Sequence, residues 1–239
     1  MVDIAEKRKQ MEDFWERYEK HIKKCDVNSY LIMDGVSLEK MDVYFDQHRI
    51  PKILFVFKES NESDAKDRKC KSIYQEDGWF GSYKNSRRDK RGITKMIKWY
   101  QCVLDIAERC RNQKELDEID IKKYQVDPET IYKFAFINMS KRGQGKKKSE
   151  DKRIVEIIEQ DKELLREEIK ILDPDVIVIG GKNVSRQFED KVISGMNKKS
   201  IHIAHFSAPV GYNDKKYNAS GETFIEQCRK AFTDVKIEV

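Results

Sequence analysis

Short apolar runs alternate with longer helical patterns along most of the chain. The runs are rich in β-branched or aromatic residues and end at polar residues or glycine, which is typical of buried strands. They lie at residues 53–57, 134–137, 176–179 and 201–204. Helical spacing predicts helices over about 92–111, between 150 and 172, around Val184 and Phe188, and from about 218 to 232. The alternation predicts an α/β fold: three layers, α/β/α, with a mainly parallel central sheet of about four strands.

The clearest unit is the strand, helix and strand between Tyr132 and Gly181. One face of its helix carries the apolar residues Ile154, Ile157, Ile158, Leu164, Leu165, Ile169 and Leu172. Pro174 ends this helix, because proline cannot continue it. We expect the two flanking strands to be parallel neighbours in one sheet.

The first 50 residues differ from this alternation. An apolar stripe at Ile4, Met11, Phe14, Trp15, Tyr18 and Ile22 predicts an amphipathic opening helix. Residues 26–50 are less regular, with a turn at Asp34-Gly35 and a short helix capped by Ser37. At the other end, residues 235–239 are a candidate final strand. We expect one α/β domain over 1–239, with a helical N-terminal extension over 1–50.

The chain has 239 residues and carries 48 Lys and Arg against 43 Asp and Glu. Basic residues gather at 84–98 and 141–153, where they either meet phosphates or only keep the protein soluble. No apolar run has the length of a membrane span, and the N-terminus lacks the apolar core of a signal peptide. We therefore expect a soluble, cytoplasmic protein without a membrane partner.

The five cysteines are scattered and form no C-x-x-C pair. Such a set, without a secretory signal, predicts reduced thiols. We expect no cofactor, no metal ion and no iron-sulfur cluster.

Polar residues follow the predicted strands at their carboxyl ends. They are Glu59, Asn61, Asn138, Gly180, His205 and Ser207. Ligands of open parallel sheets bind in the crevice outside these ends, which predicts one shared site, although any strand must end in something polar. Trp79 and Phe80 lie between two glycines and form either a hydrophobic plug or a stacking surface.

Three segments together resemble the uracil-DNA glycosylase superfamily over about residues 52–232. The first is F-I-N-M-S-K-R at 136–142, followed by a helix and P-D-V-I-V-I-G-G at 174–181. The second is H-F-S at 205–207, which is similar to the family's H-P-S motif. The third is I-L-F-V-F-K-E-S-N at 53–61, in the place of the family's first motif, with Phe57 or Lys58 where the family has glycine. The resemblance implies a glycosylase-like fold and metal-independent hydrolysis of the N-glycosidic bond of uracil or another altered base in DNA.

The resemblance also implies roles for individual residues. His205 would donate a hydrogen bond to the developing oxyanion of the departing base, and Glu59 would offset the positive charge of the sugar or orient water. Asn138 would pair with the edge of uracil. Further base contacts are expected from Asn61, Trp79, Phe80 and Ser207. Single- or double-stranded DNA is the expected partner, its phosphates held by Lys141, Arg142, Lys146, Lys147, Arg87 and Arg88.

Two other functions fit the same residues. A nucleic-acid or nucleotide binding module without catalysis would explain the altered corner at Phe57 and Lys58. Hydrolysis of a free nucleoside or nucleotide is the third possibility. The sequence leaves the preferred base, the strandedness and the oligomeric state open.

Overall fold

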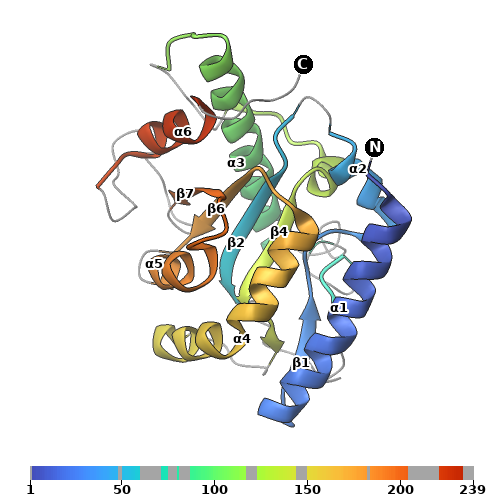
Figure 1. Ribbon diagram of the computed structural model, residues 1–239. Coiled ribbons are helices and arrows are strands. Elements are labelled where there is room, and N and C mark those ends of the chain that lie inside the picture. The colour runs from blue at the N-terminus through green and yellow to red at the C-terminus, as the bar shows by residue number, and fades with distance from the viewer. Residues whose placement is uncertain are drawn as a thin grey trace.

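The computed structural model (Figure 1) describes residues 2–47, 50–59, 71–74, 80, 87–116, 123–143, 150–181, 184–203 and 221–233. At 59, 71 and 87–91 it describes the backbone alone. Four strands form the central sheet: β2 (Ile53–Glu59), β4 (Ala135–Ser140), β6 (Val176–Gly180) and β7 (Lys199–Ile203). Their order is β4-β2-β6-β7, and all neighbouring pairs are parallel. Each strand lies at a predicted apolar run.

The strand order corrects one expectation. β4 and β6 are parallel members of one sheet, as the sequence predicts, but they are not neighbours because β2 lies between them. Phe55 of β2 pairs with Phe136 on one side and with Val178 on the other. β2 therefore occupies the interior of the sheet, although it comes first along the chain.

Helices connect and cover these strands. The α-helices are α1 (Ile4–Cys25), α2 (Met41–Phe45), α3 (Arg87–Arg111), α4 (Asp151–Leu172), α5 (Val184–Phe188) and α6 (Phe224–Thr233). A π-helix, η5 (Glu189–Ile193), continues α5, and 3-10 turns lie at η1 (Leu38–Lys40) and η4 (Pro128–Tyr132). α4 ends at Leu172, and the next residue, Asp173, adopts a left-handed conformation with φ of 44° just before Pro174. None of the described helices is long and apolar enough to cross a membrane.

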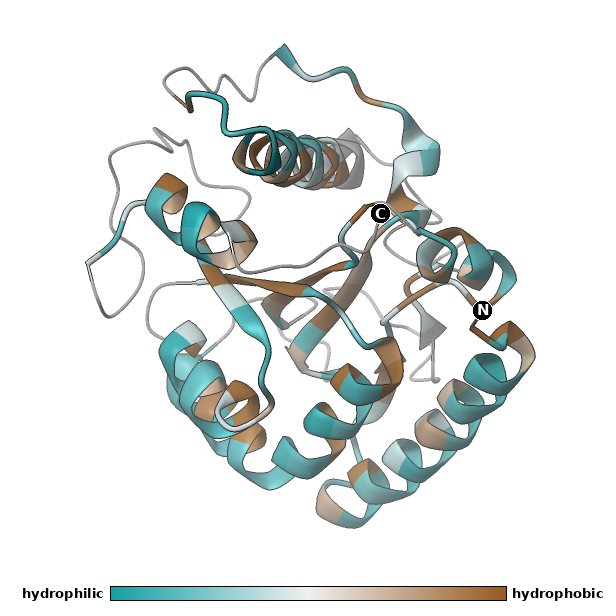
Figure 2. Cartoon of the chain, turned by 45° about the horizontal axis from the view of Figure 1, so that its top comes forward, coloured by the Kyte–Doolittle hydropathy of each residue, from teal (hydrophilic) through white to brown (hydrophobic). Residues whose placement is uncertain are grey.

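Two hydrophobic cores lie on opposite faces of the sheet. One joins the side chains of Phe55 and Phe136 to α3 and α6, and the other joins Val56 and Ile137 to α1, α4 and α5. Figure 2 shows the consequence, since the strands are largely brown while the helices carry teal residues away from the sheet. This is the predicted three-layer α/β/α architecture, with the central sheet buried on both faces.

The first 47 residues are built into this body. α1 lies along α4, and the predicted stripe on α1 from Met11 to Ile22 is buried. The segment is not purely helical as expected, because it also contains strand β1 (Tyr30–Met33). β1 is the middle strand of a small sheet with β3 (Lys71–Ser72) and β5 (Arg142–Gly143). Gly35 then bridges to Phe136, so the chain after β1 covers the edge of β4.

Candidate functional site

The direction of the chain's connections reverses between β2 and β6. From β2 the chain moves outward to β4, and it then returns across β2 to form β6 and β7. The crevice outside the carboxyl ends of the strands at such a reversal is the usual ligand site of open α/β sheets. The described residues there are Lys58 and Glu59 at the end of β2, and Gly180 and Gly181 at the end of β6.

The two glycines allow β2 side chains to approach β6 closely. A Cβ on Gly180 would lie 2.1 Å from Cε1 of Phe57, so only glycine leaves room for this ring. Gly181 has φ of 104°, a left-handed value that favours glycine, and a Cβ there would lie 3.2 Å from Cε of Lys58. Lys58 Nζ lies 2.5 Å from Oδ1 of Asp151, the first residue of α4. Lys58 thus extends past Gly181 and ties β2 to the start of α4.

Asn138 of β4 is buried and is held by a residue outside the four-stranded sheet. Oδ2 of Asp34 accepts two hydrogen bonds from it, one from its backbone N–H at 2.7 Å and one from its side-chain Nδ2 at 2.9 Å. Asn138 pairs with Phe57 of β2, and Glu59 pairs with Ser140. Glu59 and Asn138 therefore lie on neighbouring strands, two residues apart in register.

Lys141 forms a buried ion cluster with two carboxyl groups. Its Nζ contacts Oδ1 of Asp34 and lies 2.8 Å from Oε2 of Glu168 in α4, and all three side chains have no solvent exposure. Burial raises the pKa of Glu168 to about 8, and the charge of Asp34 adds to this rise while Lys141 opposes it. Burial alone would lower the pKa of Lys141, but the two acids more than offset this and leave it raised. One cation for two acids favours a protonated Glu168 near neutral pH.

Arg142 forms a second buried ion cluster on the same side of the sheet. Its Nη2 lies 2.5 Å from Oδ1 of Asp161, a buried residue of α4. Asp161 also accepts a hydrogen bond from the hydroxyl of Tyr18 at 2.9 Å, and Nε2 of His21 lies 2.9 Å from its Oδ1. The cluster therefore connects α1, α4 and β5.

These two clusters correct the expected role of Lys141 and Arg142. Both were predicted to hold DNA phosphates, but their side chains point inward and contact the buried acids Asp34, Glu168 and Asp161. A buried cation with a buried acid as partner stabilises the fold and is not presented to a ligand. The basic residues at the end of β4 are structural.

Phe80 is also part of the protein interior. It is 2% exposed, its ring stacks on Tyr74 with centroids 4.9 Å apart, and it meets the rings of Phe134 and Phe136 edge-on. Of the two alternatives that the sequence left open for Phe80, a hydrophobic plug or a stacking surface, the hydrophobic plug is the correct one. Phe80 does not present a face on which a base could stack.

Several predicted site residues lie outside the described part of the chain. They are Asn61, Trp79, Lys146, Lys147, His205 and Ser207. The backbone of Glu59 ends β2 as predicted, and the backbones of Arg87 and Arg88 begin α3. The candidate final strand at 235–239 also lies outside the described residues.

A polar group of three side chains lies beside β7. Nε2 of His202 is 2.8 Å from Oε2 of Glu189, the first residue of η5, and the hydroxyl of Ser200 donates to the other oxygen of the same carboxylate. These hydrogen bonds, above all that from His202, lower the pKa of Glu189. On the outer edge of β7, the amide of Gln227 accepts from the backbone N–H of His202 and donates to its carbonyl oxygen. Gln227 thus occupies the hydrogen-bonding positions that another strand would use.

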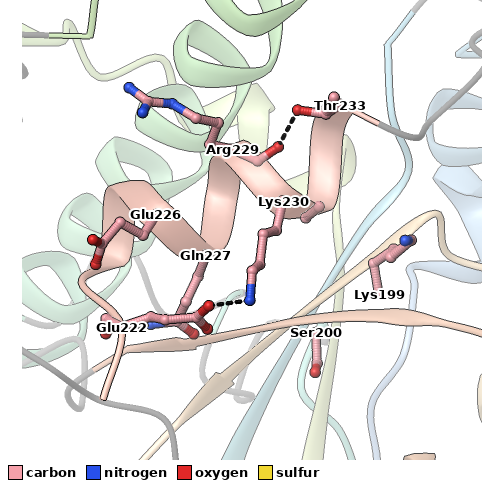
Figure 3. A pocket seen from close by; sticks show the side chains of 9 residues that line it. Lys199, Ser200, Glu222, Glu226, Gln227, Arg229, Lys230 and Thr233 are labelled. Atoms are coloured by element: carbon pink, nitrogen blue, oxygen red, sulfur yellow. Dashed lines mark hydrogen bonds and ion pairs between the residues drawn. The ribbon is translucent and has the colours of Figure 1, made fainter. Parts of the chain in front are cut away.

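A groove of about 790 Å³ lies between β7 and α6. Figure 3 shows Lys230 of α6 reaching toward Glu222, with which it forms an ion pair, while the Ser200 side chain points away from α6. The walls contain both acidic and basic residues, among them Glu226 and Arg229. The groove lies at the edge of the sheet, away from the reversal between β2 and β6.

Sequence reasoning missed the acids that organise the described part of the site. Asp34 was assigned only to a turn, and Asp161 and Glu168 were not singled out. The signal was present in α4, where Asp161 and Glu168 occur at helical spacing with Ile154, Leu165 and Leu172 on the apolar face. Acids on such a face need buried partners. No group of three or more His, Cys, Asp or Glu among the described residues could hold a metal ion.

Comparison of the chain with protein-family models, curated proteins and solved structures found no match. The resemblance to uracil-DNA glycosylases therefore remains a prediction based on the three sequence segments.

Proposed function

We propose that the chain is a DNA glycosylase-like protein that hydrolyses the N-glycosidic bond of uracil or another altered base. The observation that carries the proposal is the pairing of β2 with β4 beside the chain reversal. With strands about 4.8 Å apart and about 3.3 Å per residue, the backbones of Glu59 and Asn138 are roughly 8 Å apart across this pair. The backbones of these two residues thus lie on adjacent strands near the carboxyl edge of the sheet.

Hydrolysis of an N-glycosidic bond requires different groups at the two ends of the bond that breaks. Positive charge develops on the sugar and negative charge on the departing base. A carboxylate at Glu59 would stabilise the sugar cation or orient the attacking water. The amide of Asn138 would bind the base edge, and His205, two residues beyond the end of β7, would donate to the base oxygen as the resemblance implies.

The test is base release from defined oligonucleotides. Purified protein is incubated with single- and double-stranded DNA carrying uracil, hypoxanthine or xanthine, and abasic sites are detected by alkaline cleavage. We expect release from at least one substrate and a loss of about 100-fold or more in Glu59→Gln. Glu163→Gln, at an exposed position of α4, is the matched control and should keep full activity. No release from any substrate, while a known glycosylase is active in parallel, rejects the proposal.

A binding module without catalysis is the second candidate, and the structure gives a specific reason to consider it. Lys141 and Arg142 are turned into the protein, Asn138 is 2% exposed, and the ring of Phe57 fills the space over Gly180. Binding of uracil-containing DNA without base release, unchanged in Glu59→Gln and weakened in Asn138→Ala, would favour this candidate. Loss of base release in Glu59→Gln would exclude it.

A further inference from the structure

Asp34, Lys141 and Glu168 bring an amine and two carboxyl groups together in the protein interior. Nζ of Lys141 contacts Oδ1 of Asp34 and lies 2.8 Å from Oε2 of Glu168. None of the three side chains is exposed to solvent. Groups held in contact react as if they were present at very high concentration, so a condensation that is slow between free molecules becomes feasible in such a cluster.

The two oxygens of Asp34 have different partners. Oδ2 accepts hydrogen bonds from the backbone N–H and from Nδ2 of Asn138, at 2.7 Å and 2.9 Å. Two N–H donors on one oxygen stabilise the negative charge that develops there when a nucleophile adds to the carboxyl carbon. Oδ1 faces the amine of Lys141 instead. The carboxyl group of Asp34 is therefore arranged for attack, with Oδ2 held in place and Oδ1 positioned to leave.

Glu168 lies where it can carry a proton between the other two groups. Burial raises its pKa to about 8, so the folded chain keeps this carboxyl group protonated near neutral pH. A Cβ on Gly35 would lie 3.4 Å from Oε1 of Glu168, which places the carboxyl group beside the residue that follows Asp34. Its other oxygen lies beside the amine. A protonated carboxyl group in this position can give a proton on one side and take one up on the other.

We propose that Lys141 and Asp34 form an intramolecular isopeptide bond, with Glu168 as the proton carrier. Nζ adds to Cγ of Asp34, the bond from Cγ to Oδ1 breaks, and one water leaves. Of the three hydrogens on the ammonium group, one passes directly to Oδ1 and a second reaches Oδ1 through Glu168. The third stays as the N–H of the new amide. One positive and one negative charge disappear together, so the reaction needs no oxidant, reductant or second substrate.

Burial supplies the driving force for this reaction. Burial also lowers the pKa of Lys141, but the two acids more than offset this, so the amine must first pass a proton to Asp34. In water this transfer is unfavourable, whereas in an apolar interior the charged forms have lost their solvation, which favours the neutral forms. Condensation then replaces a buried pair of charges by a neutral amide. The oxygen of that amide still accepts the hydrogen bonds of Asn138.

The bond joins two segments that meet only in the folded chain. Asp34 precedes the bridge from Gly35 to Phe136, and Lys141 directly follows β4. The two residues are 107 positions apart. The cross-link therefore fastens the amino-terminal segment to the edge of the sheet and restricts the unfolded chain.

Asp34 has a second neighbouring nucleophile, and its reaction also releases one water. In an Asp-Gly pair the backbone nitrogen of the glycine can attack the side chain and form a succinimide. Here the N–H of Gly35 donates to the carbonyl oxygen of Phe136 at 2.6 Å, and this bridge holds it in the sheet. The structure thus favours attack by Lys141, and an experiment must distinguish the two products.

The test is the mass of the denatured full-length chain, followed by peptide mapping. We expect the purified protein, measured at once and again after prolonged incubation, to become lighter than its sequence by one water. Trypsin should then leave the chain uncut after Lys141. It should release one branched peptide, in which residues 25–40 are joined to residues 134–142.

Two variants of α4 test the proton carrier. Glu168→Gln keeps the shape of the side chain but cannot carry a proton, so the bond should form at least about 100-fold more slowly. Glu163→Gln is the matched control, because it changes an exposed acid of the same helix, and should form the bond at the rate of the parent. If Glu168→Gln does not fold, the pH dependence of the parent replaces it. Bond formation should slow as the pH rises through about 8, where Glu168 loses its proton and leaves Lys141 between two charged acids.

The other outcomes contradict the inference. A parent that keeps its full mass at both times overturns it and leaves an unreacted ion cluster. A lighter parent that trypsin still cuts after Lys141, with the lost water located at Asp34-Gly35, is the succinimide and also overturns it. Equal rates in the parent and in folded Glu168→Gln, or a rate that does not fall above about pH 8, overturn the role of Glu168. Because chains of full mass carry the ion cluster and lighter chains carry the amide, the intact mass also assigns each stability measurement to one form.

Discussion

Replacing Glu168 by glutamine should change how the stability of the protein depends on pH. Glu168 is buried beside Lys141 and Asp34, and its pKa is raised from 4.5 to about 8. Between these two pH values the unfolded chain has lost this proton while the folded chain keeps it. Unfolding then releases a proton, so the free energy of unfolding falls as the pH rises. The contribution of Glu168 is fully present below about pH 4.5 and is lost by about pH 8.

The magnitude follows from the same two values. A tenfold change in an acid dissociation constant corresponds to about 1.4 kcal/mol. A rise from 4.5 to about 8 is therefore worth up to about 5 kcal/mol of pH-dependent stability. Glutamine has the shape of the protonated acid and carries no proton to lose. Glu168→Gln should match the parent near about pH 5 and become more stable than the parent by several kcal/mol near about pH 8.5.

The measurement is urea denaturation followed by tryptophan fluorescence, at several pH values from about 5 to about 8.5. The quantity of interest is the difference in free energy of unfolding between the variant and the parent, because titrations common to both proteins cancel. Glu163→Gln, on the exposed face of the same helix, should give a difference that does not vary with pH. A constant difference for Glu168→Gln as well would refute the argument that this acid is protonated in the folded state.

Three further predictions concern the packing around the site. Arg142→Met should lower the free energy of unfolding by about 3–5 kcal/mol, because it leaves Asp161 buried without the arginine. Adding Asp161→Leu should recover part of this lost stability, and chemical denaturation measures both changes. Gly180→Ala should lower the free energy of unfolding by about 1–3 kcal/mol, because the new methyl group collides with the ring of Phe57. Adding Phe57→Leu should relieve this collision and raise the melting temperature of the Gly180→Ala variant. Gln227→Leu should expose the edge of β7 and increase aggregation, measured by light scattering at equal protein concentration.

The layers of the fold were predictable because they depend on local patterns. Strand runs and helical stripes are properties of a few consecutive residues. The pattern of apolar residues around Val56 or Ile169 is therefore enough to predict that its side chain is buried. The strand order was not predictable in this way. That β2 pairs with both β4 and β6 depends on contacts between segments far apart in the sequence, which no local period records.

The described part of the candidate site was predicted only in part. Asn138 was singled out, and it lies next to β2 near the carboxyl edge of the sheet. Its partner Asp34 was missed, because Asp-Gly is a common turn pair and its sequence does not reveal a contact 104 residues away. Lys141 and Arg142 were misassigned, because two basic residues in a lysine-rich segment suggest phosphate binding. The two acids on the apolar face of α4 were the clue that these cations are buried.

The bridge between Gly35 and Phe136 bears on how the protein can be dissected. Residues 2–47 supply the carboxylate that caps Asn138, the tyrosine that meets Asp161, and the backbone that shields the outer edge of β4. A fragment beginning after residue 50 would expose that edge. It would also leave buried polar and charged groups, such as Asn138 and Asp161, without partners that they have in the whole chain. Truncation of the amino-terminal 50 residues should therefore abolish soluble expression. The smallest part of the chain that folds by itself must include the opening helix.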